Sequence, residues 1–226
     1  RVGAIHDPTT SRGIAHLAEH LLFRESSKYG GDEVYRLTFR YLGGPQGLGL
    51  KVETDYTSTY YGGQPVYYRK YMDLIMPMFV SLVQDRLITE FGMKTEKSAV
   101  HNEFYLTEED VVEEKLLRLY YQNMYVTNPV RNSILGSPED IEAITSNQIR
   151  SFVKRHYVGS NMFAIVFGPS RNESIKFARK YLDEWSYQGT APKLNGENFD
   201  RIPIISSPKI AELPRLGLKR SYYLAM

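Results

Sequence analysis

Residues 13–24 read GIAHLAEHLLFR, and this segment carries the clearest structural and chemical pattern in the chain. Within it, His16 and His20 are four residues apart, and Glu19 follows His16 by three. On an α-helix these spacings return side chains to one face. The leucines between and after them would fill a core face of the same helix. We therefore predict an amphipathic helix over these residues, with Ser11 as its N-terminal cap.

The three polar residues of this helix suit metal-assisted hydrolysis. Two imidazoles one turn apart can bind one Zn²⁺ through neutral nitrogens and leave a carboxylate beside the open metal position. The ion lowers the pKa of a bound water to about 7. A neighbouring carboxylate can then take the proton and later pass it to a leaving amine. We predict His16 and His20 as metal ligands and Glu19 as general base. The alternative, histidines incidental to a core helix, is disfavoured because the pattern is rare by chance.

A third ligand must come from elsewhere, because a catalytic zinc site usually has three protein ligands. The predicted helix KTEKSAVHNEFYL carries Glu96 and Glu103, seven residues apart and therefore on one face. His101 points about 160° away from Glu96 at 100° per residue, which argues against His101 as a ligand. One glutamate would bind the metal and the other would support a zinc histidine. Spacing alone does not decide which of the two glutamates binds the metal and which supports the histidine.

Composition excludes several other classes of protein. The 226 residues contain no cysteine, which rules out a disulfide framework, a thiol nucleophile and a cysteine-bearing zinc site. The net charge is +2 without a basic tract, so we expect no nucleic-acid partner. The longest apolar run, residues 74–83, contains Pro77 and is far shorter than the ~20 residues of a membrane span. We expect no membrane partner, and take the cytoplasm as the expected location.

The remaining pattern predicts an α+β fold, with a mixed, largely antiparallel sheet and helices packed on one face. Residues 1–185 would form the metal-binding domain, 186–218 a linker rich in Pro, Gly, Ser and Asn, and 219–226 the start of a strand of a following or partner domain. The strands expected in the first domain are 1–6, a hairpin of 47–54 and 57–68, and a buried strand 162–168. The expected helices are 32–42, 69–88, 95–124, a short one after Ser137-Pro138, 146–157, and one capped by Asn172.

HLAEH is the inverted zinc motif His-x-x-Glu-His, and the chain resembles the pitrilysin/insulysin family of zinc metallopeptidases. That family carries, roughly 80 residues later, two glutamates seven apart, the second being the metal ligand. The resemblance implies Glu103 as ligand and Glu96 as the partner of a zinc histidine. Thr54, Thr59 and Tyr61 in TDYTSTYY resemble the family's hairpin, and HYVGSNMFAIVFG resembles its strand ending in Gly. The resemblance covers roughly residues 2–185.

The resemblance implies a zinc-dependent endopeptidase that acts on short unfolded peptides and forms one half of a two-domain clamshell. A peptide would pair as an added β-strand beside Lys51, Val52, Glu53 and Thr54. The family commonly has Asn-Ala just before the hairpin threonine, so this chain departs from it where substrate pairs.

A second homologous domain or subunit is implied as a partner, because the family completes its site with an Arg and a Tyr, seven apart, from that domain. Arg215 and Tyr222 have this separation but lack the family's helix-to-Gly-Tyr junction, and we treat them as a false match. Two other functions stay open: a non-catalytic structural or regulatory subunit of a peptidase-like assembly, and an amidase for small substrates. Measured zinc content would distinguish the non-catalytic subunit from an enzyme. Assays on a panel of peptide and non-peptide amides would distinguish the amidase from a peptidase.

Overall fold

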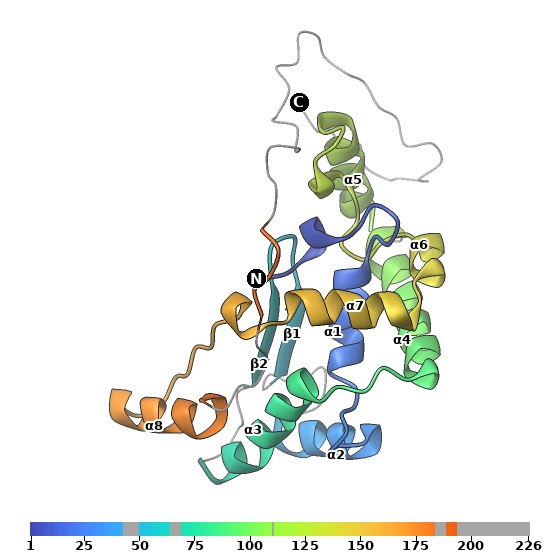
Figure 1. Cartoon of the computed structure of the whole chain (residues 1–226). Coiled ribbons are helices and arrows are strands. Elements are labelled where there is room, and N and C mark those ends of the chain that lie inside the picture. Colours follow the sequence, from blue (N-terminus) through green and yellow to red (C-terminus); the bar gives the residue numbers. More distant parts are fainter. Residues whose placement is uncertain (43–49, 64–68, 110, 184–188, 194–226) are drawn as a thin grey trace.

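Helices dominate the chain in the computed structural model, which describes residues 1–42, 50–63, 69–109, 111–183 and 189–193. The described part is mostly helical, with one small two-stranded antiparallel sheet (Figure 1). In chain order the elements are η1 (Ala4–His6), α1 (Ile14–Leu22), α2 (Gly31–Leu42), β1 (Leu50–Thr54), β2 (Thr59–Gly63), α3 (Arg69–Gln84), α4 (Glu90–Phe104), η2 (Tyr105–Glu109), α5 (Val112–Met124), η3 (Pro129–Arg131), α6 (Pro138–Ala143), α7 (Ser146–His156), η4 (Gly159–Asn161) and α8 (Arg171–Leu182).

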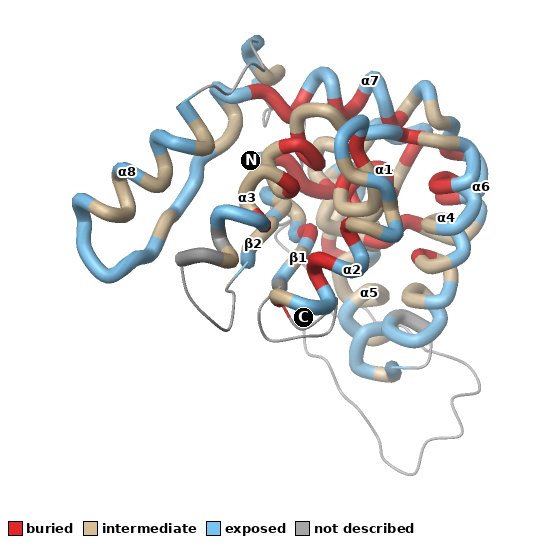
Figure 2. Tube along the Cα trace, turned by 90° about the horizontal axis from the view of Figure 1, so that it is seen from below, coloured by how far each residue is buried: buried red, intermediate tan, exposed pale blue. Residues whose placement is uncertain are grey.

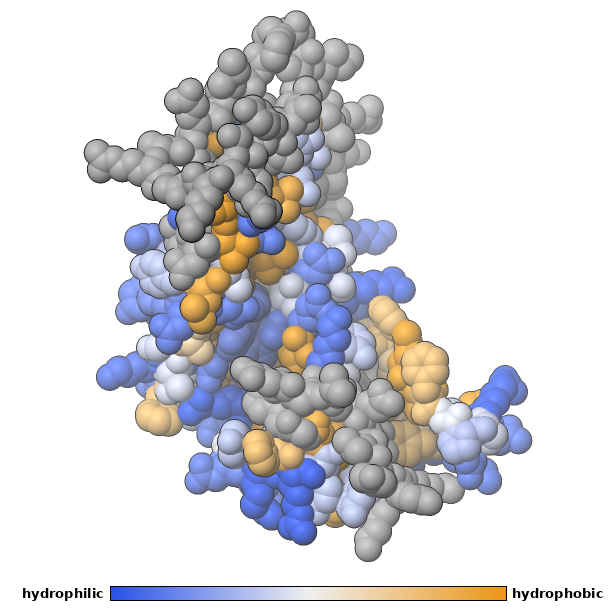
Figure 3. Space-filling model, turned by 180° about the vertical axis from the view of Figure 1, so that it is seen from behind, coloured by the Kyte–Doolittle hydropathy of each residue, from blue (hydrophilic) through white to orange (hydrophobic). Residues whose placement is uncertain are grey.

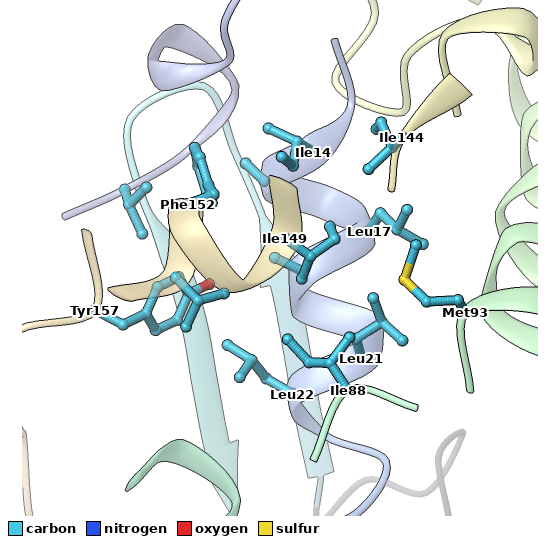
Figure 4. Close-up of a cluster of buried hydrophobic side chains, with 14 of the residues drawn as sticks. Ile14, Leu17, Leu21, Leu22, Ile88, Met93, Ile144, Ile149, Phe152 and Tyr157 are labelled. Atoms are coloured by element: carbon cyan, nitrogen blue, oxygen red, sulfur yellow. The ribbon is translucent and has the colours of Figure 1, made fainter. Parts of the chain in front are cut away.

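Helix α1 is the centre of the core. Ile14, Leu17, Leu21 and Leu22 are each at most 1% exposed, and the alanines between them let neighbouring elements approach closely. Residues of α4 and α7 pack on these side chains (Figure 4). Figure 2 shows the contrast between α1, most of whose residues are buried, and α8, whose residues are intermediate or exposed. Each fully buried leucine or isoleucine contributes about 1.5–3 kcal/mol, so the helix that carries the HLAEH motif is firmly held.

The start of α1 differs from the prediction that Ser11 caps it. The helix follows Gly13, whose φ of +80° favours glycine, and no Ser11 hydroxyl bonds to its first turn. Instead the Asp7 carboxylate accepts the backbone N–H groups of Gly13, at 2.7 Å, and Ala15, at 3.1 Å. The Ser11 hydroxyl accepts a hydrogen bond from the Gln148 side chain. The cap prediction was wrong because a carboxylate from the preceding loop reaches the free N–H groups first.

The predicted hairpin is confirmed within the described residues. β1 and β2 pair antiparallel from Leu50 opposite Gly63 to Thr54 opposite Thr59. Side chains alternate along β1, so that Lys51 is exposed while Thr54 is 8% exposed and faces inward. Strand β1 of the hairpin therefore packs against α1.

The predicted helix 95–124 is interrupted. α4 begins at its cap Thr89, whose hydroxyl accepts from the Gly92 N–H, and it ends at Phe104. A π-helical turn, η2, follows before α5 starts. The Thr107 hydroxyl donates to the Glu103 carbonyl at 2.7 Å within this turn. Such wide turns occur often at functional sites, and this one directly follows a predicted metal ligand.

Two predicted strands are wrong. Residues 4–6 form the 3-10 turn η1, and residues 162–168 run extended between η4 and α8 without a strand partner among the described residues (Figure 1). Phe163, Ile165 and Phe167 are 69, 66 and 93% exposed. Figure 3 shows that hydrophobic residues also reach the surface on the face seen from behind. A strand forms only where a neighbour completes its backbone hydrogen bonds. The wider mixed sheet of the prediction is therefore not formed by the described residues.

The C-terminal predictions fare differently. Helix α8 is confirmed, although its cap is Ser170, which accepts from the Glu173 N–H, and not Asn172. Apart from residues 189–193, the predicted linker 186–218 and the strand 219–226 lie outside the described residues, as do Arg215 and Tyr222. None of the helices in the described ranges is long and apolar enough to cross a bilayer.

Candidate metal centre

Helix α1 presents both motif histidines on one face. The rings of His16 and His20 have centroids 4.7 Å apart and meet edge to face. One ligand atom each from His16, Glu19 and His20 lies within 4.8 Å of the other two, so the three could hold one ion. His16 is buried, whereas the His20 side chain is 21% exposed. The helical period therefore brings the side chains of the three residues close together in space.

Glu103 approaches this cluster from α4. Its Oε2 atom lies 3.6 Å from Nε2 of His16 and 3.4 Å from Nε2 of His20. Zinc bonds of ~2.0–2.2 Å at tetrahedral angles place ligand atoms roughly 3.3–3.6 Å apart. The two imidazole–carboxylate separations match that requirement. The chemistry of two imidazoles and one carboxylate, and these two separations, are therefore compatible with one zinc ion.

Glu96 supports the site from the same face of α4. Its Oε2 accepts a hydrogen bond from Nδ1 of His20 at 3.1 Å, and its Oε1 accepts from the Arg24 guanidinium at 2.5 Å. Arg24 also lies over the Phe91 ring, 5.3 Å from its centroid. A proton held on Nδ1 leaves the Nε2 lone pair of His20 free toward Glu103. Nδ1 of His16, by contrast, finds no hydrogen-bond partner in the described part of the chain, so no carboxylate fixes that ring from its Nδ1 side.

Glu19 lies inside the cluster but is held differently from Glu103. It is 7% exposed, and its Oε2 accepts a hydrogen bond from the Thr54 hydroxyl at 2.5 Å. Burial raises the pKa of Glu19, and the Thr54 hydrogen bond partly offsets that rise. His101 faces away, with Nε2 3.1 Å from the Pro138 carbonyl, as helical spacing predicts. Glu19, a buried carboxylate with a raised pKa next to the proposed metal ligands, is therefore suited to proton transfer.

The electrostatics of the site call for a cation. Three carboxylates and the Arg24 guanidinium give a net formal charge of −2 when both imidazoles are neutral. Burial lowers the pKa of His16, and the charge of His20 lowers it further. Burial also disfavours charge on His20, but hydrogen bonds to Glu103 and Glu96 outweigh it and raise its pKa. The surroundings thus attract positive charge, which a divalent ion would supply.

The four residues predicted to bind substrate do not share one environment. The Lys51 and Glu53 side chains project outward, 69% and 54% exposed, and form an ion pair at 2.5 Å. Val52 is half-buried against a core cluster, and Thr54 faces the metal site. Only the strand backbone and the two charged side chains are therefore placed to meet a peptide along β1.

Sequence reasoning missed two contacts at this site. The Thr54 contact to Glu19 had a usable signal, because strand alternation places Thr54 on the face of Val52 and opposite to that of Lys51. The sequence signal for the contact between Arg24 and Glu96 was weaker. Arg24 lies four residues after His20, one helical turn further, although α1 itself ends at Leu22.

Comparisons with known proteins agree with this geometry. The family model for insulinase, peptidase family M16, matches residues 1–137. The uncharacterized zinc protease YmxG of Bacillus subtilis is 24% identical over 200 residues, 87% of this chain and 46% of that protein. The mitochondrial-processing peptidase subunit beta of Neurospora crassa is 26% identical over 197 residues, 84% of this chain and 38% of that protein.

A solved structure shares the fold. The first half of the periplasmic protease PqqL from Escherichia coli superimposes with a TM-score of 0.75 at 18% identity, over 85% of this chain and 41% of that one. This chain spans less than half the length of the curated relatives described above. The family match covers more than half of the chain and includes the complete motif together with Glu96 and Glu103 of α4. The chain therefore belongs to the insulinase family of zinc metallopeptidases, peptidase family M16.

Proposed function

We propose that this chain is the metal-binding half of a zinc endopeptidase that hydrolyses short unfolded peptides. The observation that carries the proposal is the approach of Glu103 Oε2 to both histidine Nε2 atoms, with the Glu19 carboxylate beside them. Relatives named zinc proteases support the choice of metal.

Each residue of the site has a separate task. His16, His20 and Glu103 would hold the ion, and Glu96 keeps His20 in the required tautomer. A bound zinc ion supplies a Lewis acid that polarises a peptide carbonyl. Glu19 accepts a proton from the attacking water and delivers it to the leaving amine. Burial raises the pKa of Glu19, which makes it a stronger base for the proton of the attacking water.

The hairpin is the proposed substrate platform. Within the described residues β1 pairs with β2 along one edge, and no other strand pairs with β1. An extended peptide could add to the other edge through backbone hydrogen bonds, beside residues 51–54. Backbone pairing demands an unfolded segment, which accounts for the proposed preference for short unfolded peptides. The exposed Lys51 and Glu53 would meet neighbouring substrate side chains.

A second domain or subunit is part of the proposal. The matched region makes up 46% of the zinc protease relative described above and 41% of the solved first half of PqqL, so both continue well beyond it. Donors that stabilise the oxyanion of the reaction would come from that partner. The rival function is a non-catalytic subunit, and the complete set of motif residues in this chain disfavours it.

The test is Glu19→Gln in the full-length native protein, assayed with an unstructured peptide and with metal analysis. We expect cleavage to fall by about 10²–10⁴-fold, the usual contribution of a general base, while zinc stays bound. Glu33→Gln, on the exposed side of α2, is the matched control and should leave cleavage unchanged. Unchanged cleavage in the zinc-loaded Glu19→Gln protein rejects the proposal. Absence of stoichiometric zinc in the wild type favours the non-catalytic subunit.

A further inference from the structure

Thr54 joins the hairpin to the proposed general base. It is the last residue of β1, and its side chain is 8% exposed on the inner face of the strand. Its hydroxyl lies 2.5 Å from Oε2 of Glu19, which is itself 7% exposed. Hydrogen bonds to a charged acceptor are about twice as strong as neutral ones, and burial shields this one from water.

The direction of this hydrogen bond follows from the available protons. An ionised carboxylate only accepts, so the single hydroxyl proton of Thr54 must point at Glu19. The neighbouring hydroxyl of Thr59 does not compete for that carboxylate, because it donates to the Val2 carbonyl at 2.8 Å. The two threonine oxygens are 3.4 Å apart across the hairpin. Thr54 is therefore a donor committed to one oxygen of Glu19.

We propose that Thr54 is a positioning residue for Glu19, holding its Oε2 so that the other oxygen, Oε1, meets the reacting water. The proposal rests on the proposed function. Thr54 is also the last residue of β1, the strand beside which the peptide would pair. It therefore connects the proposed substrate-binding strand to the proposed general base, Glu19. Neither a substrate-contacting role nor a metal-binding role is assigned to its side chain.

Loss of the hydroxyl has a defined expected effect. A carboxylate freed at Oε2 can rotate about its terminal side-chain bond, and small misplacement of a reacting group costs up to about 10²-fold in rate. The peptide would still pair with the β1 backbone, so substrate binding should change little. The effect should fall on kcat and not on KM, as for an interaction made only in the transition state.

The experiment compares Thr54→Val, Thr54→Ser and Thr38→Val in the full-length native protein, with zinc content measured for each. Valine removes the hydroxyl at nearly constant shape, and serine keeps it. Thr38 is the matched control, a threonine 3% exposed whose hydroxyl donates to the Val34 carbonyl within α2. We expect Thr54→Val to lose about 10–100-fold in kcat with KM within about twofold, Thr54→Ser to recover most of it, and Thr38→Val to match the wild type.

Three measurements can overturn the proposal. One is a zinc-loaded Thr54→Val protein with kcat within about twofold of the wild type. The second is a rise in KM at constant kcat, which would make Thr54 a substrate-binding residue. The third is a crystal structure of Thr54→Val with the Glu19 carboxylate in its original place, a readout independent of activity. Thr54→Ala gives the same comparisons if the valine variant does not fold.

A double-mutant cycle separates this proposal from the proposed function. If Thr54 acts through Glu19, Thr54→Val should add less than about twofold to the loss in Glu19→Gln. Additive losses would overturn the positioning role while the proposed function stands. If Glu19→Gln alone leaves cleavage unchanged, the proposed function itself has failed.

Discussion

Glu96 and His20 are 76 residues apart in sequence and lie on different helices, yet Glu96 Oε2 accepts a hydrogen bond from His20 Nδ1 at 3.1 Å. The other oxygen of the same carboxylate is held by Arg24 at 2.5 Å. Glu96 is thus fixed at both oxygens, and it fixes the ring in turn. This contact joins α1 to α4 beside the point where Glu103 approaches both imidazoles.

Glu96→Gln should weaken zinc binding by about 10–100-fold, the usual cost of removing a partner of a metal-binding histidine. The amide has a weaker acceptor and no charge, so the His20 tautomer is less strictly set. Competition with a chromophoric chelator measures the affinity. Glu90→Gln, in the exposed first turn of the same helix, should bind zinc like the wild type. Equal affinities for the Glu96 and Glu90 variants would show that Glu96 does not support the metal.

Glu103→Gln should lose stoichiometric zinc under dialysis that leaves the wild type loaded, because it removes one of three proposed ligands. Metal analysis by atomic emission measures the result. His101→Gln is the control on the same helix, since His101 faces the Pro138 carbonyl and not the metal cluster. Full zinc retention by the Glu103 variant would exclude this residue as the third ligand and leave the two histidines with Glu19.

Asp7→Ala should destabilise the fold by about 1–3 kcal/mol, the cost of losing a helix cap and leaving buried donors unpaired. The Asp7 carboxylate accepts the N–H groups of Gly13 and Ala15 at the start of α1. Urea unfolding followed by circular dichroism measures the free energy of unfolding. Glu33→Gln removes a half-exposed carboxylate that pairs with Arg36 and should change the free energy of unfolding by less than about 1 kcal/mol. A similarly small change for Asp7→Ala would mean that water caps the helix as well.

Stability should fall on acidification through His156. Burial first, and then the neighbouring His6 and Arg155, lower the pKa of His156 from 6.5 to about 4. Between these two values the unfolded chain takes up a proton that the folded chain refuses, so the free energy of unfolding decreases as the pH falls. Below about pH 4 both states are protonated at this position, and its contribution becomes constant.

His156→Phe should flatten this dependence, and the ring can keep its packing on Phe152, 4.6 Å away between centroids. Urea unfolding at roughly pH 7 and pH 5, with chelator present throughout, compares the two proteins under equal metal conditions. Identical slopes for the wild type and His156→Phe would assign the acid sensitivity to other groups.

Several elements of the fold followed from local sequence alone. The helical period of residues 13–24 and the Thr- and Tyr-rich segments of the hairpin are local signals. The helix forms over Ile14–Leu22 and the hairpin pairs over 50–54 and 59–63, while 47–49 and 64–68 of the predicted strands lie outside the described residues. The strand prediction at 162–168 failed because the same apolar alternation needs a neighbouring strand, which the described residues do not provide. The long helix 95–124 failed at its middle, since amphipathic spacing does not reveal a π-helical turn.

The sequence by itself determined that His16, Glu19 and His20 share one helical face and that Glu96 and Glu103 share another, because helical spacing depends only on separation along the chain. Only the tertiary structure decided that the two faces meet, with Glu103 Oε2 3.4 and 3.6 Å from the two Nε2 atoms. It also decided that Thr54 contacts Glu19 and that Arg24 contacts Glu96. Contacts between distant segments depend on how α1, α4 and the hairpin pack, and packing is a property of the whole core.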